Sequence, residues 1–291
     1  MKVGFAVGTG RCGTKFLAEL FAKHTSLAAH HERHPLSDTF HRYCKWYDIP
    51  VDRAGFLRTK RRGIELDLTE KAYSFEASAF LSLSIAELHE AFDARFVLMV
   101  RRPERVVISY LKKGWYSEPI DLDDPSLPPS TQRCAEFHHF LGRTLPRGDE
   151  FDRWNALTRV GKLGWYWHHL NRSVLEQFEK LAAGVGQVRR LEDLDYSVVS
   201  DVSEQLGMPS PPDERQFAKL SAKRPNSLSG LGHIRDWSPT EREEFEREVR
   251  PLAERLGYEW RVEDLLANLP VAPGKSPGSF RSILDKIKGR S

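Results

Sequence analysis

The stretch Val3-Gly-Phe-Ala-Val-Gly-Thr-Gly-Arg-Cys-Gly-Thr-Lys15 decides the fold of this chain. Its first part, Val3–Val7, is a short apolar run that ends in glycines, as a buried parallel strand does. From residue 13 to residue 23 the apolar side chains recur at helical spacing. The chain therefore opens with a strand, a glycine-rich loop and a helix.

The loop of residues 8–15 fits two nucleotide-binding patterns. Gly8, Gly10 and Gly13 match the GxGxxG pattern of dinucleotide-binding folds. Glu32 follows near the position where such folds place an acid for the ribose. The same residues almost match the P-loop pattern GxxxxGK[ST], except that one residue separates Gly13 from Lys15.

A third pattern, the cysteine loop of phosphatases, is excluded. That chemistry needs a cysteine followed by five residues and an arginine, and after Cys12 the arginine position holds Ala18. In both remaining patterns, glycines let backbone N–H groups converge on an anion, and the following helix directs its positive end at the same point. Arg11 and Lys15 add two cations, which favour a terminal phosphate or a phosphosulfate over an internal pyrophosphate.

Composition excludes several classes of protein. The chain has 291 residues, with 44 basic and 41 acidic residues, and this near balance argues against a nucleic-acid partner. We interpret the basic run Arg58-Thr-Lys-Arg-Arg62 as a solvated loop. Three cysteines without CxxC spacing favour a reducing compartment. No apolar stretch approaches the roughly 20 residues of a membrane span, and the apolar start is too short for a signal peptide, so we expect a cytoplasmic protein.

The rest of the chain alternates strand and helix signals, which predicts the α/β class. We expect a P-loop-like three-layer sandwich with a central, mostly parallel sheet flanked by helices. Residues 1–268 would form one domain with insertions at about 35–62 and 114–150, and 269–291 a mobile tail. We read 35–62 as irregular, 114–149 as a long surface loop and 209–236 as mostly loop. Further strands are expected at 26–29, 95–100 and 186–191, and helices at 79–92, 104–113, 151–181, 197–206 and 239–256.

A second pair of candidate phosphate-binding residues follows the apolar run of residues 95–100. Arg101 ends that predicted strand, and Ser109 lies eight residues further on, near the second turn of the next predicted helix. An arginine at the carboxyl end of a strand and a serine on the following helix can converge on one further phosphate. Neither a dinucleotide-binding dehydrogenase nor a plain P-loop kinase requires that pair.

These segments resemble motifs of the sulfotransferase family. Arg11-Cys-Gly-Thr-Lys-Phe16 resembles its 5′-phosphosulfate loop, in which Arg or Lys precedes Ser-Gly-Thr-Thr. The segment Phe96-Val-Leu-Met-Val-Arg-Arg-Pro-Glu-Arg-Val-Val-Ile-Ser109 is similar to its 3′-phosphate motif. Three more similar stretches follow in the family's order: Val188-Arg-Arg-Leu-Glu-Asp-Leu194, Leu206-Gly-Met208, and Trp237-Ser-Pro239 through Leu256-Gly-Tyr258. Arg11, in place of lysine, is typical of the carbohydrate and tyrosylprotein branch, and we expect a soluble bacterial member.

The resemblance implies a donor, 3′-phosphoadenosine 5′-phosphosulfate, and no metal. The nucleotide would be bound by Gly10, Arg11, Cys12, Gly13, Thr14, Lys15, Phe16, Arg101, Ser109, Arg224 and Ser227. Arg101 and Ser109 would hold the 3′-phosphate, and Arg224 and Ser227 would lie in a late loop that closes over the nucleotide. The chain departs from the family at Cys12, which replaces a serine, and at Lys15, which usually is a threonine.

The catalytic group implied by the resemblance is Glu32, with Arg11 and Lys15 stabilising the leaving phosphate. Glu32 follows Arg11 by 21 residues, and tyrosine-modifying members place their base at matching spacing. The rival bases are His31, His34 and Glu76. Some relatives carry a catalytic lysine near the position of Glu76, and this chain has none there.

Two other functions remain open from the sequence. One is a kinase-like phosphotransferase that uses ATP, and the other is a non-catalytic nucleotide-binding protein of the same fold. The acceptor of a sulfotransferase could be a hydroxyl of a sugar, lipid, small molecule or peptide, or an amine. We interpret Trp165-Tyr-Trp167 as core rather than as an acceptor pocket. The run His30-His-Glu-Arg-His34 lacks the HExxH spacing of zinc enzymes.

Overall fold

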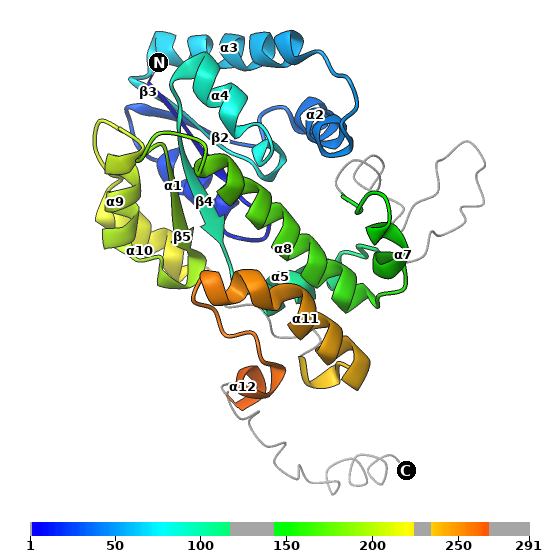
Figure 1. The fold of residues 1–291 in the computed structure, drawn as a ribbon. Helices are drawn as coiled ribbons and strands as arrows, with labels where there is room; N and C mark the ends of the chain where they lie inside the picture. Colours follow the sequence, from blue (N-terminus) through cyan, green and yellow to red (C-terminus); the bar gives the residue numbers. More distant parts are fainter. Residues whose placement is uncertain (1, 117–142, 224–233, 268–291) are drawn as a thin grey trace, which may run out of the picture.

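The computed structural model describes residues 2–116, 143–223 and 234–267 (Figure 1). Its centre is a five-stranded sheet in the order β2-β3-β1-β4-β5, and all four pairings are parallel. Helices cover both faces, so the predicted three-layer α/β class is confirmed. The strands are β1 Val3–Val7, β2 Leu27–His31, β3 Tyr73–Ala77, β4 Arg95–Val100 and β5 Gly186–Arg190.

The helices agree with most of the helical periodicity in the sequence. The predicted helix of residues 151–181 is in fact two helices, interrupted at residues 156–158. Residues 209–236, predicted as mostly loop, include α10. The helices are α1 Thr14–Phe21, α2 Pro35–Tyr47, α3 Arg53–Glu70, α4 Ile85–Phe92, α5 Pro103–Lys112, α7 Glu150–Asn155, α8 Arg159–Phe178, α9 Tyr196–Gln205, α10 Glu214–Ala222, α11 Pro239–Arg255 and α12 Val262–Ala267.

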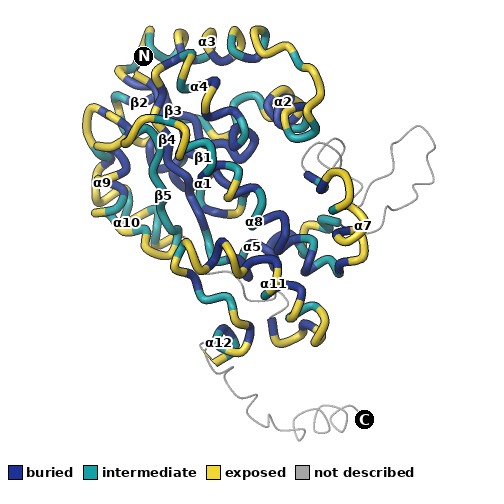
Figure 2. Tube along the Cα trace, viewed as in Figure 1, coloured by how far each residue is buried: buried dark blue, intermediate teal, exposed yellow. Residues whose placement is uncertain are grey.

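Alternating side chains of the central strands build two separate cores. Phe5 of β1 and Leu98 of β4 lie in the core under α3, α4, α5, α8 and α11. Ala6 and Met99, one position further along, lie in the core under α1, α9 and α10. Successive residues of a strand point to opposite faces, so β1 and residues 96–100 of β4 are apolar on both faces. Of the five strands, β1, β3 and β4 are almost wholly buried, whereas β5 is of intermediate burial (Figure 2).

The strand order places a crevice at the carboxyl ends of β1 and β4. The chain leaves β1 through α1 on one face and proceeds towards β2. It leaves β4 through α5 on the other face and proceeds towards β5. Neighbouring strands whose connections run in opposite directions leave a gap between their loops, where α/β proteins bind ligands. The loop of residues 8–13 and Arg101 both lie at this end of the sheet.

The prediction that residues 35–62 are irregular is wrong, because α2 and most of α3 occupy them. The basic run 58–62 is likewise helical rather than a solvated loop. Arg58 and Arg62 are exposed, but Lys60 is only 1% exposed. Of the predicted long loop at 114–149, residues 117–142 lie outside the described part, as does the predicted tail at 269–291. Within the described ranges, no helix is long and apolar enough to span a bilayer.

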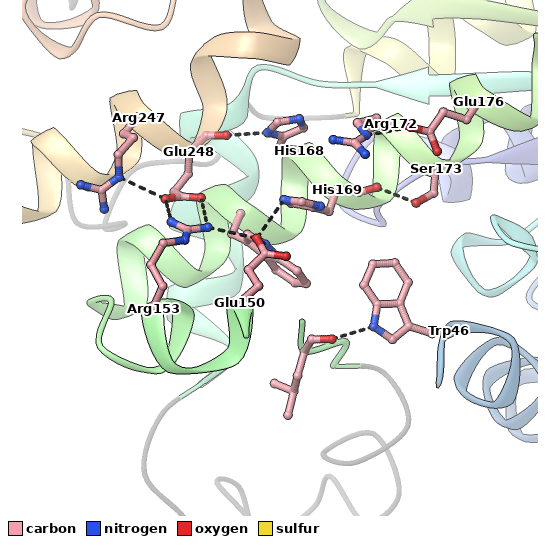
Figure 3. A network of polar contacts seen from close by, with 12 residues as sticks. Trp46, Glu150, Arg153, His168, His169, Arg172, Ser173, Glu176, Arg247 and Glu248 are labelled. Atoms are coloured by element: carbon pink, nitrogen blue, oxygen red, sulfur yellow. Dashed lines mark hydrogen bonds and ion pairs between the residues drawn. The ribbon is translucent and has the colours of Figure 1, made fainter. Parts of the chain in front are cut away.

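Charged side chains tie α7, α8 and α11 together (Figure 3). Arg153 of α7 donates to the carboxylate of Glu248 on α11. Glu150 accepts a 3.0 Å hydrogen bond from Trp165 Nε1 on α8 and lies 3.8 Å from His169 Nε2. The network fixes α8, the helix that also reaches the crevice.

Candidate functional site

The loop after β1 adopts a conformation that needs glycine at two positions. Gly10 has φ +81° and Gly13 has φ +97°, a region that side chains disfavour. A Cβ at Gly10 would lie 2.5 Å from Tyr110 Oη, and one at Gly13 would lie 2.6 Å from Leu191 Cδ1. Arg11, between them, also has a positive φ, of 59°. The glycines therefore permit both the backbone turn and the close packing around it.

Side chains from distant elements hold the carbonyl groups of this loop. Ser82 Oγ donates to the Gly8 carbonyl at 2.8 Å. The hydroxyls of Tyr110 on α5 and Tyr166 on α8 both donate to the Thr9 carbonyl. Because side chains outside the loop donate hydrogen bonds to the carbonyls of Gly8 and Thr9, the backbone of the loop is held in one conformation.

The N-terminus of α1 opens at the end of this loop. Gly13 is its N-cap and supplies no side-chain cap, and the first turn contains no acidic residue. Four N–H groups at a helix N-terminus lack intrahelical partners, and the helix dipole makes this end positive. An anion can bind there, as in other glycine-loop nucleotide sites.

Cys12 lies under the loop and is fully buried. Burial raises the pKa of its thiol to about 11, and the nearby backbone N–H groups of Gly10 and Thr14 oppose that rise only in part. The thiol is therefore protonated at neutral pH and is no nucleophile.

The structure brings the two predicted phosphate motifs together. Arg11 Nε donates a 2.7 Å hydrogen bond to Ser109 Oγ. Arg101 Nη1 donates to the Arg11 carbonyl at 3.1 Å. Burial lowers the pKa of Arg101 most, and the charges of Arg105 and Arg11 lower it further, although Glu192 raises it. Two arginines and a serine therefore gather beside the helix N-terminus, and an anion would relieve their mutual repulsion.

Sequence reasoning missed several residues that position this site. Glu192 Oε1 accepts from the backbone N–H of Arg102 at 3.0 Å, and its other oxygen accepts from Tyr258 Oη at 2.9 Å. Trp167 Nε1 donates to the Arg101 carbonyl at 2.9 Å. The aromatic run on α8 is buried core, as expected, but Tyr166 and Trp167 also bind the backbone of both motifs. The N–H or O–H of a buried tryptophan or tyrosine usually has a hydrogen-bond partner. The aromatic run on α8 could therefore have indicated polar contacts of this kind.

Two predicted binding residues point away from the loop or into the core. Lys15 is exposed, and its ammonium lies 3.8 Å from Glu19 Oε1 along α1. Phe16 is buried in the second core and packs edge-on against Phe217 of α10. Only the backbone of Phe16 can therefore face a ligand. The long, exposed Lys15 side chain could reach a ligand at the loop by adopting another rotamer.

Glu32 lies directly after β2, at the same end of the sheet as the loop. Its backbone has φ +51°, and its N–H donates to the Ala77 carbonyl at 3.1 Å. Its carboxylate is 27% exposed and lies 3.9 Å from His31 Nε2. Because β3 lies between β2 and β1, two strand spacings place the Glu32 backbone roughly 10 Å from the loop. That separation leaves room for a transferred group and an acceptor.

The rival bases lie in different surroundings. Glu76 of β3 is buried, and both its oxygens lie 2.9 Å from Lys60 Nζ on α3. His34 caps α2, and burial lowers its pKa, so it is neutral at pH 7. Glu76 is thus already bound by protein groups, whereas the Glu32 carboxylate is open to solvent.

Two predicted nucleotide ligands, Arg224 and Ser227, lie outside the described residues. In the three described ranges, no group of three or more His, Cys, Asp or Glu residues is arranged to hold a metal ion. The groups that are described form a positively charged cluster at the switch point of a parallel sheet, with a carboxylate at the same edge. Such a site can bind a nucleotide with two phosphate groups and can accept a proton.

Comparisons with known proteins give only a distant likeness. No family model matches the chain, and no curated protein matches it. Among solved structures, the sulfotransferase domain of the Synechococcus PCC 7002 olefin synthase aligns with TM-score 0.47 and 13% identity, over 88% of this chain and 94% of that one. The sulfotransferase domain from the curacin biosynthetic pathway aligns with TM-score 0.47 and 14% identity, over 88% and 97%. This likeness is too distant to carry an argument about chemistry.

Proposed function

We propose that this chain is a sulfotransferase that uses 3′-phosphoadenosine 5′-phosphosulfate as its donor. The observation that carries the proposal is the meeting of Arg11, Arg101 and Ser109 beside the N-terminus of α1. The loop and helix end would bind the 5′-phosphosulfate, and Arg101 with Ser109 would bind the 3′-phosphate. A dehydrogenase or a kinase for ATP has no use for that second phosphate group.

The reaction would be an in-line displacement at sulfur. Glu32 takes the proton of an acceptor hydroxyl or amine, whose oxygen or nitrogen forms a bond to sulfur. The bond between sulfur and the bridging oxygen breaks, and its electron pair stays on the 5′-phosphate. Arg11 and the loop N–H groups stabilise that charge, so adenosine 3′,5′-bisphosphate leaves. Lys15 would stabilise that charge only after its ammonium group moves away from Glu19.

For the acceptor, we propose only the chemical group that reacts. It would be a sugar, lipid, small molecule or peptide that offers a hydroxyl or amine near Glu32. The free, buried thiols of Cys12 and Cys44 support a reducing, cytoplasmic setting.

Calorimetry with three ligands tests the proposal. We expect adenosine 3′,5′-bisphosphate to bind at least tenfold more tightly than ATP or NADH, because only it fills both phosphate positions. Transfer from radiolabelled donor to a panel of phenol, sugar and lipid hydroxyls should then fall to a low residual rate in Glu32→Gln with unchanged nucleotide binding. Tighter binding of ATP would favour the kinase. Bisphosphate binding without any transfer would favour a non-catalytic nucleotide-binding protein.

A further inference from the structure

The residue after the candidate base, Arg33, is held by two carboxylates, Glu76 of β3 and Asp67 of α3. Arg33 donates its backbone N–H to Glu76 Oε1 at 3.2 Å. Its guanidinium is paired with Asp67 of α3. Asp67 also accepts from His30 Nε2 at 3.1 Å, so residues on both sides of Glu32 are bound to one carboxylate.

Gly63 allows this arrangement. A Cβ on Gly63 would lie 2.4 Å from Arg33 Nη1 and 3.2 Å from Arg33 Cδ. The Arg33 side chain therefore lies against the α3 backbone at Gly63, where a side chain is missing. Glycine lowers helix stability by about 1 kcal/mol relative to alanine, so its presence in mid-helix indicates a packing reason.

Glu76 is itself fixed by a buried charge. Lys60 Nζ lies 2.9 Å from both its oxygens and 2.7 Å from Asp38 Oδ2 on α2. Lys60 and Asp38 are each 1% exposed. A charged pair that is shielded from solvent in this way has a well-defined geometry, because moving either partner would leave a buried charge unpaired. The carboxylate that accepts from Arg33 is thus a rigid anchor.

We infer that Gly63 and Glu76 are positioning residues for Glu32: together they fix Arg33, and through it the strained turn that aims the Glu32 carboxylate. The inference rests on the proposed function, in which Glu32 is the base. Glu32 has a positive φ of 51° and its own N–H is bonded only to Ala77 among the described contacts. A non-glycine residue in that conformation persists when its surroundings hold it, and Arg33 is the neighbour that is held.

Amide hydrogen exchange tests the anchor without reference to turnover. In Gly63→Ala and Glu76→Ala, we expect the amides of residues 32 and 33 to exchange about tenfold faster, while the amides of residues 8–15 are unchanged. Glu76→Gln keeps an acceptor oxygen and should restore most of the protection. The matched control is Leu66→Ala, an exposed residue of the same helix. Unchanged exchange at 32 and 33, or an equal rise at 8–15, would overturn the anchor.

A double-mutant cycle tests the link to Glu32. Gly63→Ala should lower kcat about 10- to 100-fold with the donor KM within twofold, because the base is misaimed while the nucleotide site is intact. In a Glu32→Gln background, Gly63→Ala should cause no further loss. Additive losses would show that Gly63 acts on structure alone and would overturn the inference. If Glu32→Gln transfers at the wild-type rate, the assignment of the base fails, and the exchange result still decides whether α3 fixes this turn.

Discussion

Arg11 Nε lies 2.7 Å from Ser109 Oγ, although 98 positions separate the two residues in the sequence. The contact joins the loop after β1 to the helix after β4, and Arg101 spans the same junction through the Arg11 carbonyl. Neither motif alone distinguishes among nucleotide-binding folds. Their contact makes them one site.

Replacing Arg101 by alanine should weaken the binding of adenosine 3′,5′-bisphosphate about 10- to 100-fold, because a charge-assisted contact with a phosphate is lost. Binding of adenosine 5′-phosphate, which lacks the 3′-phosphate, should change less than threefold. Calorimetry with both ligands measures the difference. Lys112→Ala removes an exposed charge from α5 and serves as the control. An equal loss for both ligands would contradict the assignment of Arg101 to the 3′-phosphate.

The thiol of Cys12 should be inert in the folded protein, because it is fully buried and its pKa is raised to about 11. Iodoacetamide at pH 8 should label it only after unfolding, which peptide mass spectrometry can follow. Cys12→Ser should keep bisphosphate affinity within about threefold, since the loop binds through backbone N–H groups. Rapid labelling of the native protein, with loss of binding, would instead make the thiol a functional group.

Lys60→Met should be among the most destabilising changes in α3. It leaves Asp38 and Glu76 buried without their cation, at a cost of about 3–5 kcal/mol. Thermal or urea unfolding measures this loss, and Arg62→Met, on the exposed side of the helix, should stay within about 0.5 kcal/mol. Adding Asp38→Asn and Glu76→Gln to Lys60→Met should recover part of the stability. No recovery would mean that packing, rather than charge, fixes Lys60.

Stability should fall as pH drops from about 6.5 towards 4, in part through His169. Burial lowers the pKa of this histidine from 6.5 to about 4, so the folded state disfavours its charged form. The stability that His169 contributes is therefore complete above pH 6.5. It is lost between pH 6.5 and about 4, where the histidine of the unfolded chain is protonated before that of the folded protein. In His169→Gln, the difference in unfolding free energy between pH 7 and pH 5 should shrink by roughly 1–2 kcal/mol. An identical pH dependence in the two proteins would contradict this.

Local signals were enough to predict β1 and β4, but not β3, whose sequence Tyr73–Ala77 includes the polar residues Ser74 and Glu76. The apolar runs at Val3–Val7 and Arg95–Val100 are uninterrupted and end in a glycine loop or an arginine. In a parallel sheet these ends meet at one edge, so the convergence of Arg11 with Ser109 followed from strand order.

Helices α2 and α3 could not be predicted in the same way, because their inward faces are partly charged. Lys60 lies one turn from Phe56 and from Ile64 on the buried side of α3. A hydrophobic pattern broken by lysine resembles a solvated segment. Only the acids on α2 and β3 make that burial possible, and they come from elsewhere in the chain. The positions of Tyr110 and Tyr166 beside Thr9 depend on tertiary packing in the same way.

The two tyrosine hydroxyls on the Thr9 carbonyl have a consequence for the speed of binding. They come from different helices, so the loop is shaped before any nucleotide arrives. A binding surface that needs no ordering loses little entropy on association, and its on-rate is not limited by a conformational step. Association of an anionic nucleotide with this loop should therefore follow a single exponential whose rate rises linearly with nucleotide concentration and falls with salt.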